Sequence, residues 1–204
     1  MKKLLLPVLL LTVFSVSAVR LAYEPLTADE RRFAIDYYEK TKARLLADVK
    51  GLSANQLNWK ADTSRWSIYQ CTEHIALAET MIWQWVQGAE KQPATPQKRT
   101  EVKVTSDQII AMLTDRSHKF HAPEQLVPGS QFANEEAALA AFVSRRDSTI
   151  NYIKSTPDDL KDHFMAFPFG MGDCYQGLIF LAAHSARHTL QIEEVMATPG
   201  FPKN

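Results

Sequence analysis

The sequence predicts an all-α fold, a four-helix bundle with a long crossover that contains a short extra helix. Helix-start signals recur along the chain, each an N-cap residue followed three positions later by Glu or Gln. The pairs are Thr27 with Glu30, Ser67 with Gln70, Thr105 with Gln108, and Asp173 with Gln176. Behind these signals, apolar residues return every three or four positions, which is the period of a helix. Alternation with a period of two, which would indicate strands, is confined to Val102–Val104.

The first two long helices each begin at one of these caps and end near a glycine. We expect the first helix to run from Thr27 to the region of Gly51, since glycine is a common residue just past a helix end. The second is expected from Ser67 to Gly88, and the proline-containing segment Gln92–Pro96 then breaks the helical pattern. Both helices are long enough to be members of a helix bundle.

The second half of the chain supplies the remaining helices. A short helix is expected over residues 105–119, a long one over 134–155 and the last over 173–196. The segment 157–172 is predicted to be an irregular loop. Because the connection between the second and third long helices is long, it is expected to cross from one end of the bundle to the other.

Composition fits an ordinary folded domain without a strongly charged partner. The 204 residues include 23 Lys+Arg and 23 Asp+Glu, and 46% are hydrophobic. These values exclude the compositions typical of disordered and collagen-like chains. Balanced charge, together with the lack of a basic stripe, argues against nucleic acid as a partner.

Residues 1–18 have the pattern of a secretory signal peptide. Lys2 and Lys3 form a short basic region, an apolar run follows, and the small residues Ser17 and Ala18 favour cleavage after Ala18. The apolar run of about 13 residues is shorter than the roughly 20 that a spanning helix needs. We therefore expect a signal peptide over 1–18, one helical domain over 19–204, and export to the periplasm or the medium. No stable membrane span is expected after cleavage.

Three of the six histidines are predicted on buried faces of two long helices. His184 and His188 are four residues apart, so that their rings project from one helix face within about 6 Å of each other. His74 has a similar inward position on the second long helix. Three buried imidazoles need polar partners, and one divalent metal ion can serve all three. A hydrogen-bonded cluster without metal is the alternative. The glutamate of a zinc-protease His-Glu-x-x-His motif is absent.

Two segments around these histidines resemble the DinB-like superfamily. Residues 66–79, WSIYQCTEHIALAE, are similar to the family's tryptophan–serine to histidine segment. Residues 184–192, HSARHTLQI, are similar to its closing His-x-x-x-His-x-x-Gln-Ile segment. The resemblance covers essentially all of residues 19–204. It implies a four-helix bundle that binds a divalent metal ion, commonly zinc or nickel, through His74, His184 and His188. Because members are commonly dimers, a homodimer is among the expected assemblies.

The resemblance leaves the reaction open. Some relatives resemble thiol-dependent transferases or isomerases, and others resemble metal-dependent hydrolases. Because small thiol cofactors are mainly cytoplasmic, the signal peptide argues against the first group. Three histidines that leave a metal position open favour polarisation of a substrate oxygen and acidification of water. We expect a metal-dependent hydrolase or transferase that acts on a small molecule, without an assigned catalytic side chain. The alternative is a non-catalytic metal-containing binding or sensor module.

Residues near the histidines have weaker assignments. Gln70 and Gln191 lie one turn from a predicted ligand, where they would orient an imidazole or serve as a helix cap and a rim residue. Glu73 is rotated by about 100° from His74 and is expected to face another helix or solvent. Three phenylalanines before the last helix are candidates to cover the open side of the site. They are Phe164, Phe167 and Phe169.

Cys71 and Cys174 are not expected to form a disulfide. If His74 faces His184, the helical rise places the two cysteines at least about 10 Å apart, beyond the limit of about 7 Å between Cα atoms. Cys71 is a packing residue or a fourth metal ligand. No ligand role is expected for the other histidines, which lie near a helix end or in a loop. They are His118, His121 and His163.

Overall fold

The structure of the chain is a computed structural model that describes residues 25–203. The predicted signal peptide, residues 1–18, lies outside the described residues. Among the helices of residues 25–203, none combines the length and the hydrophobicity that a membrane crossing requires.

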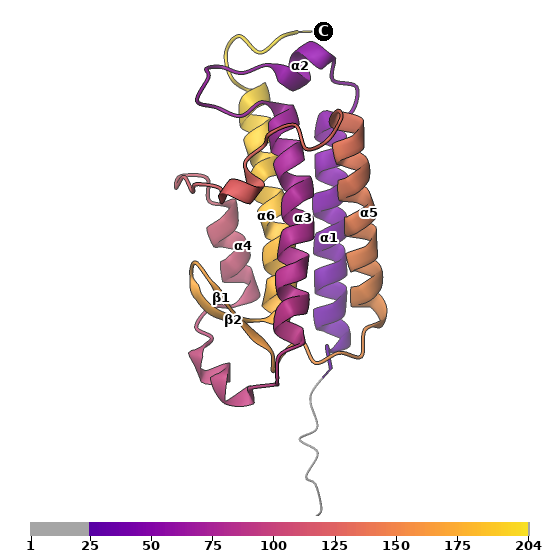
Figure 1. Cartoon of the computed structure of the whole chain (residues 1–204), viewed down its shortest axis with the longest axis vertical. Coiled ribbons are helices and arrows are strands. Elements are labelled where there is room, and N and C mark those ends of the chain that lie inside the picture. Colours follow the sequence, from indigo (N-terminus) through magenta and orange to yellow (C-terminus); the bar gives the residue numbers. More distant parts are fainter. Residues whose placement is uncertain (1–24, 204) are drawn as a thin grey trace, which may run out of the picture.

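Four long helices pack side by side as an elongated bundle (Figure 1). They are α1 (Ala28–Val49), α3 (Ile68–Glu90), α5 (Glu135–Ser155) and α6 (Cys174–Met196). Each of α3 and α1 packs against both α5 and α6, so the four helices form a closed ring. Figure 1 shows α1 and α6 running in one direction and α3 and α5 in the other. The predicted four-helix bundle is confirmed.

The connection between α3 and α5 is the predicted long crossover. It contains the 3-10 helix η1 (Pro96–Glu101), the helix α4 (Ser106–Thr114) and the 3-10 turn η2 (Glu124–Leu126). The crossover returns the chain along the bundle, so that α5 starts at the same end as α3 (Figure 1). On the way, α4 packs against α6 and covers that helix on its outer side.

The four capping boxes expected from the sequence all form, at the starts of α1, α3, α4 and α6. A fifth box, at Ser53, starts the short helix α2 (Ala54–Asn58), which the sequence analysis did not anticipate. In contrast to the expected end at Lys119, α4 stops at Thr114. The physical reason is local: the carboxylate of Asp115 accepts the backbone N–H of Ser117 at 2.9 Å, which turns the chain out of the helix.

The segment 157–172 was expected to be an irregular loop, and part of it is a β-hairpin. Strands β1 (Phe164–Phe167) and β2 (Gly170–Asp173) pair antiparallel, with Phe164 opposite Asp173. Strands of four residues are too short to show a clear alternation in the sequence. Gly170 has φ +118°, a backbone angle that glycine adopts readily and other residues rarely do. The alternating segment Val102–Val104 also makes one β-type contact, because Val102 forms an isolated bridge with Met171 of β2.

A buried polar layer crosses the otherwise apolar core. The fully buried Arg146 of α5 pairs with Glu79 of α3, whose side chain is also fully buried. Arg146 donates to the hydroxyl of Thr41 on α1 at 2.9 Å and to that of Ser185 on α6 at 2.8 Å. Ser185 in turn donates to Glu79 at 2.6 Å. One guanidinium therefore connects all four long helices.

Candidate metal centre

The three predicted histidines meet between α3 and α6. His74 comes from α3, and His184 and His188 come from successive turns of α6. The Nε2 atoms of His74 and His184 are 3.3 Å apart. One nitrogen from each of the three rings lies within 4.8 Å of the others. The i, i+4 spacing on α6 and the facing position on α3 are thus sufficient to bring the cluster together.

Two of the imidazoles are held in a defined tautomer. The Nδ1 atom of His74 lies 2.7 Å from the backbone carbonyl of Leu126 in η2. Since a carbonyl only accepts, Nδ1 carries the proton and donates it, which leaves a lone pair on Nε2. The Nδ1 atom of His188 lies 2.9 Å from Oε1 of Gln191, an acceptor, and the same argument applies. Both rings therefore present an unprotonated Nε2 atom.

The donor set fits a divalent metal ion. Two nitrogens that ligate one zinc ion at about 2.0–2.1 Å in tetrahedral geometry lie about 3.4 Å apart. The separation of 3.3 Å between His74 and His184 matches this value. The Nδ1 atom of His184 is buried without a hydrogen-bond partner, so no hydrogen bond offsets the loss of hydration at that nitrogen. Neutral imidazoles suit several divalent transition metals, namely zinc, copper, iron and nickel.

Burial keeps the three imidazoles neutral. Loss of hydration lowers the pKa of His74, although its hydrogen bond to Leu126 opposes this. Loss of hydration and then the neighbouring imidazoles lower the pKa values of His184 and His188 well below the ordinary value. Neutral imidazole is the form that binds metal, so the direction of these pKa shifts is consistent with a metal site.

The surroundings of the histidines are aromatic. The Trp66 ring lies 4.8 Å from that of His74 and 6.0 Å from that of His188, between centroids. On the other side, the Phe180 ring is 6.3 Å from that of His184. In residues 25–203, no carboxylate hydrogen-bonds to any of the three imidazoles. The geometry therefore supplies no general base in contact with a ligand ring.

Comparison with known proteins gives the family. The model of the DinB superfamily matches residues 37–192, which include all three histidines. The chain belongs to the DinB superfamily. It is 24% identical over 149 residues to YuaE, an uncharacterised protein of Bacillus subtilis strain 168, covering 72% of this chain and 88% of that protein.

A solved structure shares the fold of this DinB-superfamily chain. It is that of YfiT from Bacillus subtilis, described as a probable metal-dependent hydrolase with an unusual four-helix bundle topology. The match has a TM-score of 0.59 at 15% sequence identity, and it covers 89% of this chain and 94% of that one. At this identity, the likeness shows the fold.

The polar neighbours of the histidines have different roles in this DinB-superfamily site. Gln191 contacts a histidine directly, through the bond to His188 given above. Gln70 instead completes the capping box of α3, so it serves as a helix cap. Glu73 is turned away from His74, but it faces neither another helix nor solvent: it is buried, and its carboxylate accepts the backbone N–H of Gln131. That hydrogen bond attaches the loop that precedes α5 to α3.

Two arginines that the sequence analysis did not single out hold the crossover beside the site. Arg187, next to His188 in the chain, donates to the carbonyls of Leu113 and Asp115 at 2.8 and 2.7 Å. Arg116 donates to Glu194 at 3.0 and 2.7 Å and to Gln191 at 3.4 Å. The sequence did offer a signal for Arg187, because this cation lies within a largely apolar helix. If such a charge is buried, it requires polar partners.

Two of the three candidate phenylalanines approach the site through another ring. Phe167 and Phe169 stack in parallel, 4.9 Å apart, and their centroids lie 5.2 and 6.0 Å from that of Phe180. Phe180 in turn contacts His184. Phe164 lies elsewhere, where the guanidinium of Arg99 covers its ring at 4.9 Å.

The remaining cysteines and histidines lie outside the cluster. Cys71 and Cys174 are both buried and free, so the expectation of no disulfide is confirmed. Burial raises the pKa of the Cys71 thiol to about 12, and in residues 25–203 the ligand cluster contains only the three histidines. The other three histidines are exposed or partly buried. They are His118, His121 and His163.

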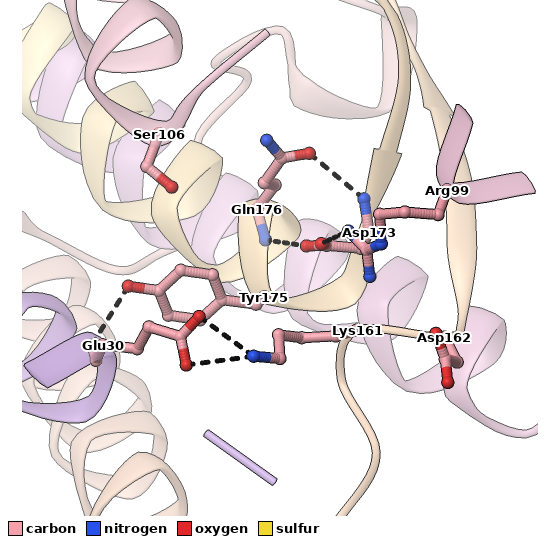
Figure 2. Close-up of a pocket in the computed structure, with 8 residues that line it drawn as sticks. All are labelled: Glu30, Arg99, Ser106, Lys161, Asp162, Asp173, Tyr175 and Gln176. Atoms are coloured by element: carbon pink, nitrogen blue, oxygen red, sulfur yellow. Dashed lines mark hydrogen bonds and ion pairs between the residues drawn. The ribbon is translucent and has the colours of Figure 1, made fainter. Parts of the chain in front are cut away.

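A cavity in the described part of the chain lies away from the histidines, beside the start of α6. Its volume is about 480 Å³, and Figure 2 shows the charged and polar side chains that line it. Lys161 pairs with Glu30 at 3.2 Å, Arg99 pairs with Asp173, and Tyr175 donates to the backbone carbonyl of Glu30 at 3.0 Å. Because these groups already pair with one another, we interpret the cavity as a polar surface region at the start of α6.

Proposed function

We propose that this chain holds a divalent metal ion, zinc or nickel, through His74, His184 and His188 and acts as a metal-dependent hydrolase on a small molecule. One observation carries the proposal. His74 and His188 each have Nδ1 committed to an acceptor, and the free Nε2 atom of His74 faces that of His184 at 3.3 Å. Such an arrangement is typical of metal-binding histidines oriented by a second set of hydrogen bonds.

Each residue of the site has a defined task in this proposal. A divalent ion bound by three imidazoles supplies Lewis-acid chemistry, polarising a substrate oxygen and making water more acidic. The Leu126 carbonyl fixes the ring of His74, and Gln191 fixes that of His188. Trp66 packs beside His74 and Phe180 beside His184, so both rings have an apolar neighbour.

Hydrolysis is favoured over group transfer to a small thiol. The fold matches that of YfiT, which is described as a probable metal-dependent hydrolase. In addition, we propose that residues 1–18 export the protein, away from the cytoplasm where small thiols are concentrated. N-terminal sequencing of the exported protein should then find Val19 as the first residue. A full-length chain retained in the cytoplasm would contradict the export proposal.

The test of function combines metal content with turnover. Purified wild type should retain zinc or nickel in a near one-to-one ratio, and His184→Ala should lose it. His121→Ala, which changes an exposed histidine outside the cluster, is the matched control and should retain the metal. Turnover of a panel of small esters and amides should stop on chelation and return when metal is restored. Metal binding without turnover on any substrate would favour a binding or sensor module, and wild type without metal would contradict the proposal.

A further inference from the structure

Apolar side chains continue from the histidines along both helices that carry them. On α3, Leu77 and Met81 follow His74 at three and seven residues, so they lie on the same side of the helix. Both are partly buried and pack against the apolar core. On α6, Phe180 precedes His184 by one turn and is 8% exposed. The wall next to the cluster is therefore apolar on both helices.

The β-hairpin extends this wall with an aromatic stack. Phe167 and Phe169 stack on each other, and both contact Phe180. Phe167 is buried, whereas Phe169 is partly exposed and forms the accessible end of the stack. The Phe167 ring packs closely over the backbone of β2, because a Cβ atom at Gly172 would lie only 2.7 Å from it. A series of ring contacts thus connects His184 through Phe180 to the partly exposed Phe169.

The charged side chains nearest to the histidines are occupied elsewhere. Arg187 donates to three backbone carbonyls of the crossover, and its guanidinium lies 4.9 Å from the centre of the Phe120 ring. Arg116 is paired with Glu194, and Glu79 belongs to the buried layer with Arg146. A charged group placed beside Phe180 would lose its hydration without gaining a partner, at a cost in affinity. An apolar group at the same place would gain from burial.

We propose that the substrate of the metal centre carries an aromatic or alkyl group next to its reacting atom, and that this group lies against Phe180 and Phe169. This inference rests on the proposed function, because it takes the histidine cluster as the metal site. It adds a substrate class, an acyl or aryl compound without charge at that position, and it makes Phe169 a specificity residue.

Two hydroxamates test this substrate class without requiring turnover. Acetohydroxamate and benzohydroxamate bind a metal through the same group and differ in a methyl versus a phenyl substituent. Calorimetric titration of the zinc-loaded protein should show benzohydroxamate binding about tenfold more tightly, as expected for burial of an added ring. Phe169→Ala should reduce this ratio about threefold or more and leave the affinity for acetohydroxamate unchanged, whereas Phe169→Leu should retain most of the ratio.

Phe33→Ala is the matched control, since Phe33 is an exposed phenylalanine on α1, a helix that contributes nothing to the cluster. It should leave the ratio of the two affinities unchanged. Equal affinities in wild type, or a ratio that Phe169→Ala does not change while circular dichroism shows a folded protein, would overturn the substrate class. Loss of zinc from wild type, or zinc-loaded protein that binds neither hydroxamate, would instead show that the proposed metal function is wrong and would remove the basis of the inference.

Discussion

Removal of Arg146 should destabilise the bundle more than any surface arginine would. Its side chain and that of Glu79 are both fully buried, and their ion pair lies at the centre of the polar layer. Arg146→Ala leaves Glu79 with Ser185 as its hydrogen-bond donor and without a compensating charge. Breaking a buried pair by removing one partner costs about 3–5 kcal/mol of unfolding free energy. We expect a loss in this range.

The loss should grow with pH, and the sign follows from Glu79. Burial raises the pKa of Glu79 above its ordinary value, and the charge of Arg146 opposes this rise. Without Arg146 the pKa rises further, so the folded variant holds a proton that the unfolded chain releases. The contribution of such a group to the stability of the protein is present at low pH and is lost as the pH rises through the pKa of the folded state. The variant should therefore lose more stability at pH 8 than at pH 5.

Urea unfolding followed by circular dichroism measures these differences. Arg32→Ala is the control, because the Arg32 side chain is 69% exposed and pairs with Asp29 at the surface, where such pairs contribute about 0–1 kcal/mol. Replacing both members of the buried pair by apolar residues, Glu79→Leu with Arg146→Met, should cost less than Arg146→Ala alone. A loss of less than about 1 kcal/mol in Arg146→Ala, or a loss that does not depend on pH, would refute this reasoning.

Three further predictions follow from single contacts. Gln191→Ala removes the acceptor of His188 and should weaken zinc binding about 10–100-fold in a chelator competition, whereas equal affinity would exclude an orienting role. Burial raises the pKa of Glu135 to about 7, so the stability of the wild type falls as the pH rises from about 4.5 through 7. Glu135→Gln should therefore be more stable than wild type by about 3 kcal/mol at pH 8 and equally stable at pH 4 in urea unfolding, and equal stability at both pH values would contradict this. Gly172→Ala forces a Cβ atom against the Phe167 ring and should cost about 1–3 kcal/mol in thermal unfolding, and an unchanged melting temperature would show that the hairpin yields freely.

Local signals in the sequence account for the bundle and the histidine cluster. Capping boxes place the starts of the helices to within a residue or so, because cap and helix are adjacent in the chain. His184 and His188 are on one face by their spacing, and a bundle in which α3 packs on α6 brings His74 to them. Each of these steps uses contacts within one helix or between two helices with clear apolar faces.

Contacts between distant segments account for what the sequence did not reveal. The Leu126 carbonyl that fixes His74 belongs to an irregular turn 52 residues away, and no residue type marks a backbone acceptor. The four members of the polar layer come from four different helices, and their association depends on the packing of all four. The hairpin strands span four residues each, too few for a periodic signal.

The most direct test of the metal centre is an anomalous-scattering map of crystals of the purified protein, with data collected at the zinc and nickel absorption edges. We expect one peak between α3 and α6, at about 2.0–2.1 Å from one nitrogen of each of His74, His184 and His188. Crystals of His184→Ala should lack the peak. A wild-type map without a peak at the three histidines, from protein purified without chelator and supplied with both metals, would contradict this expectation.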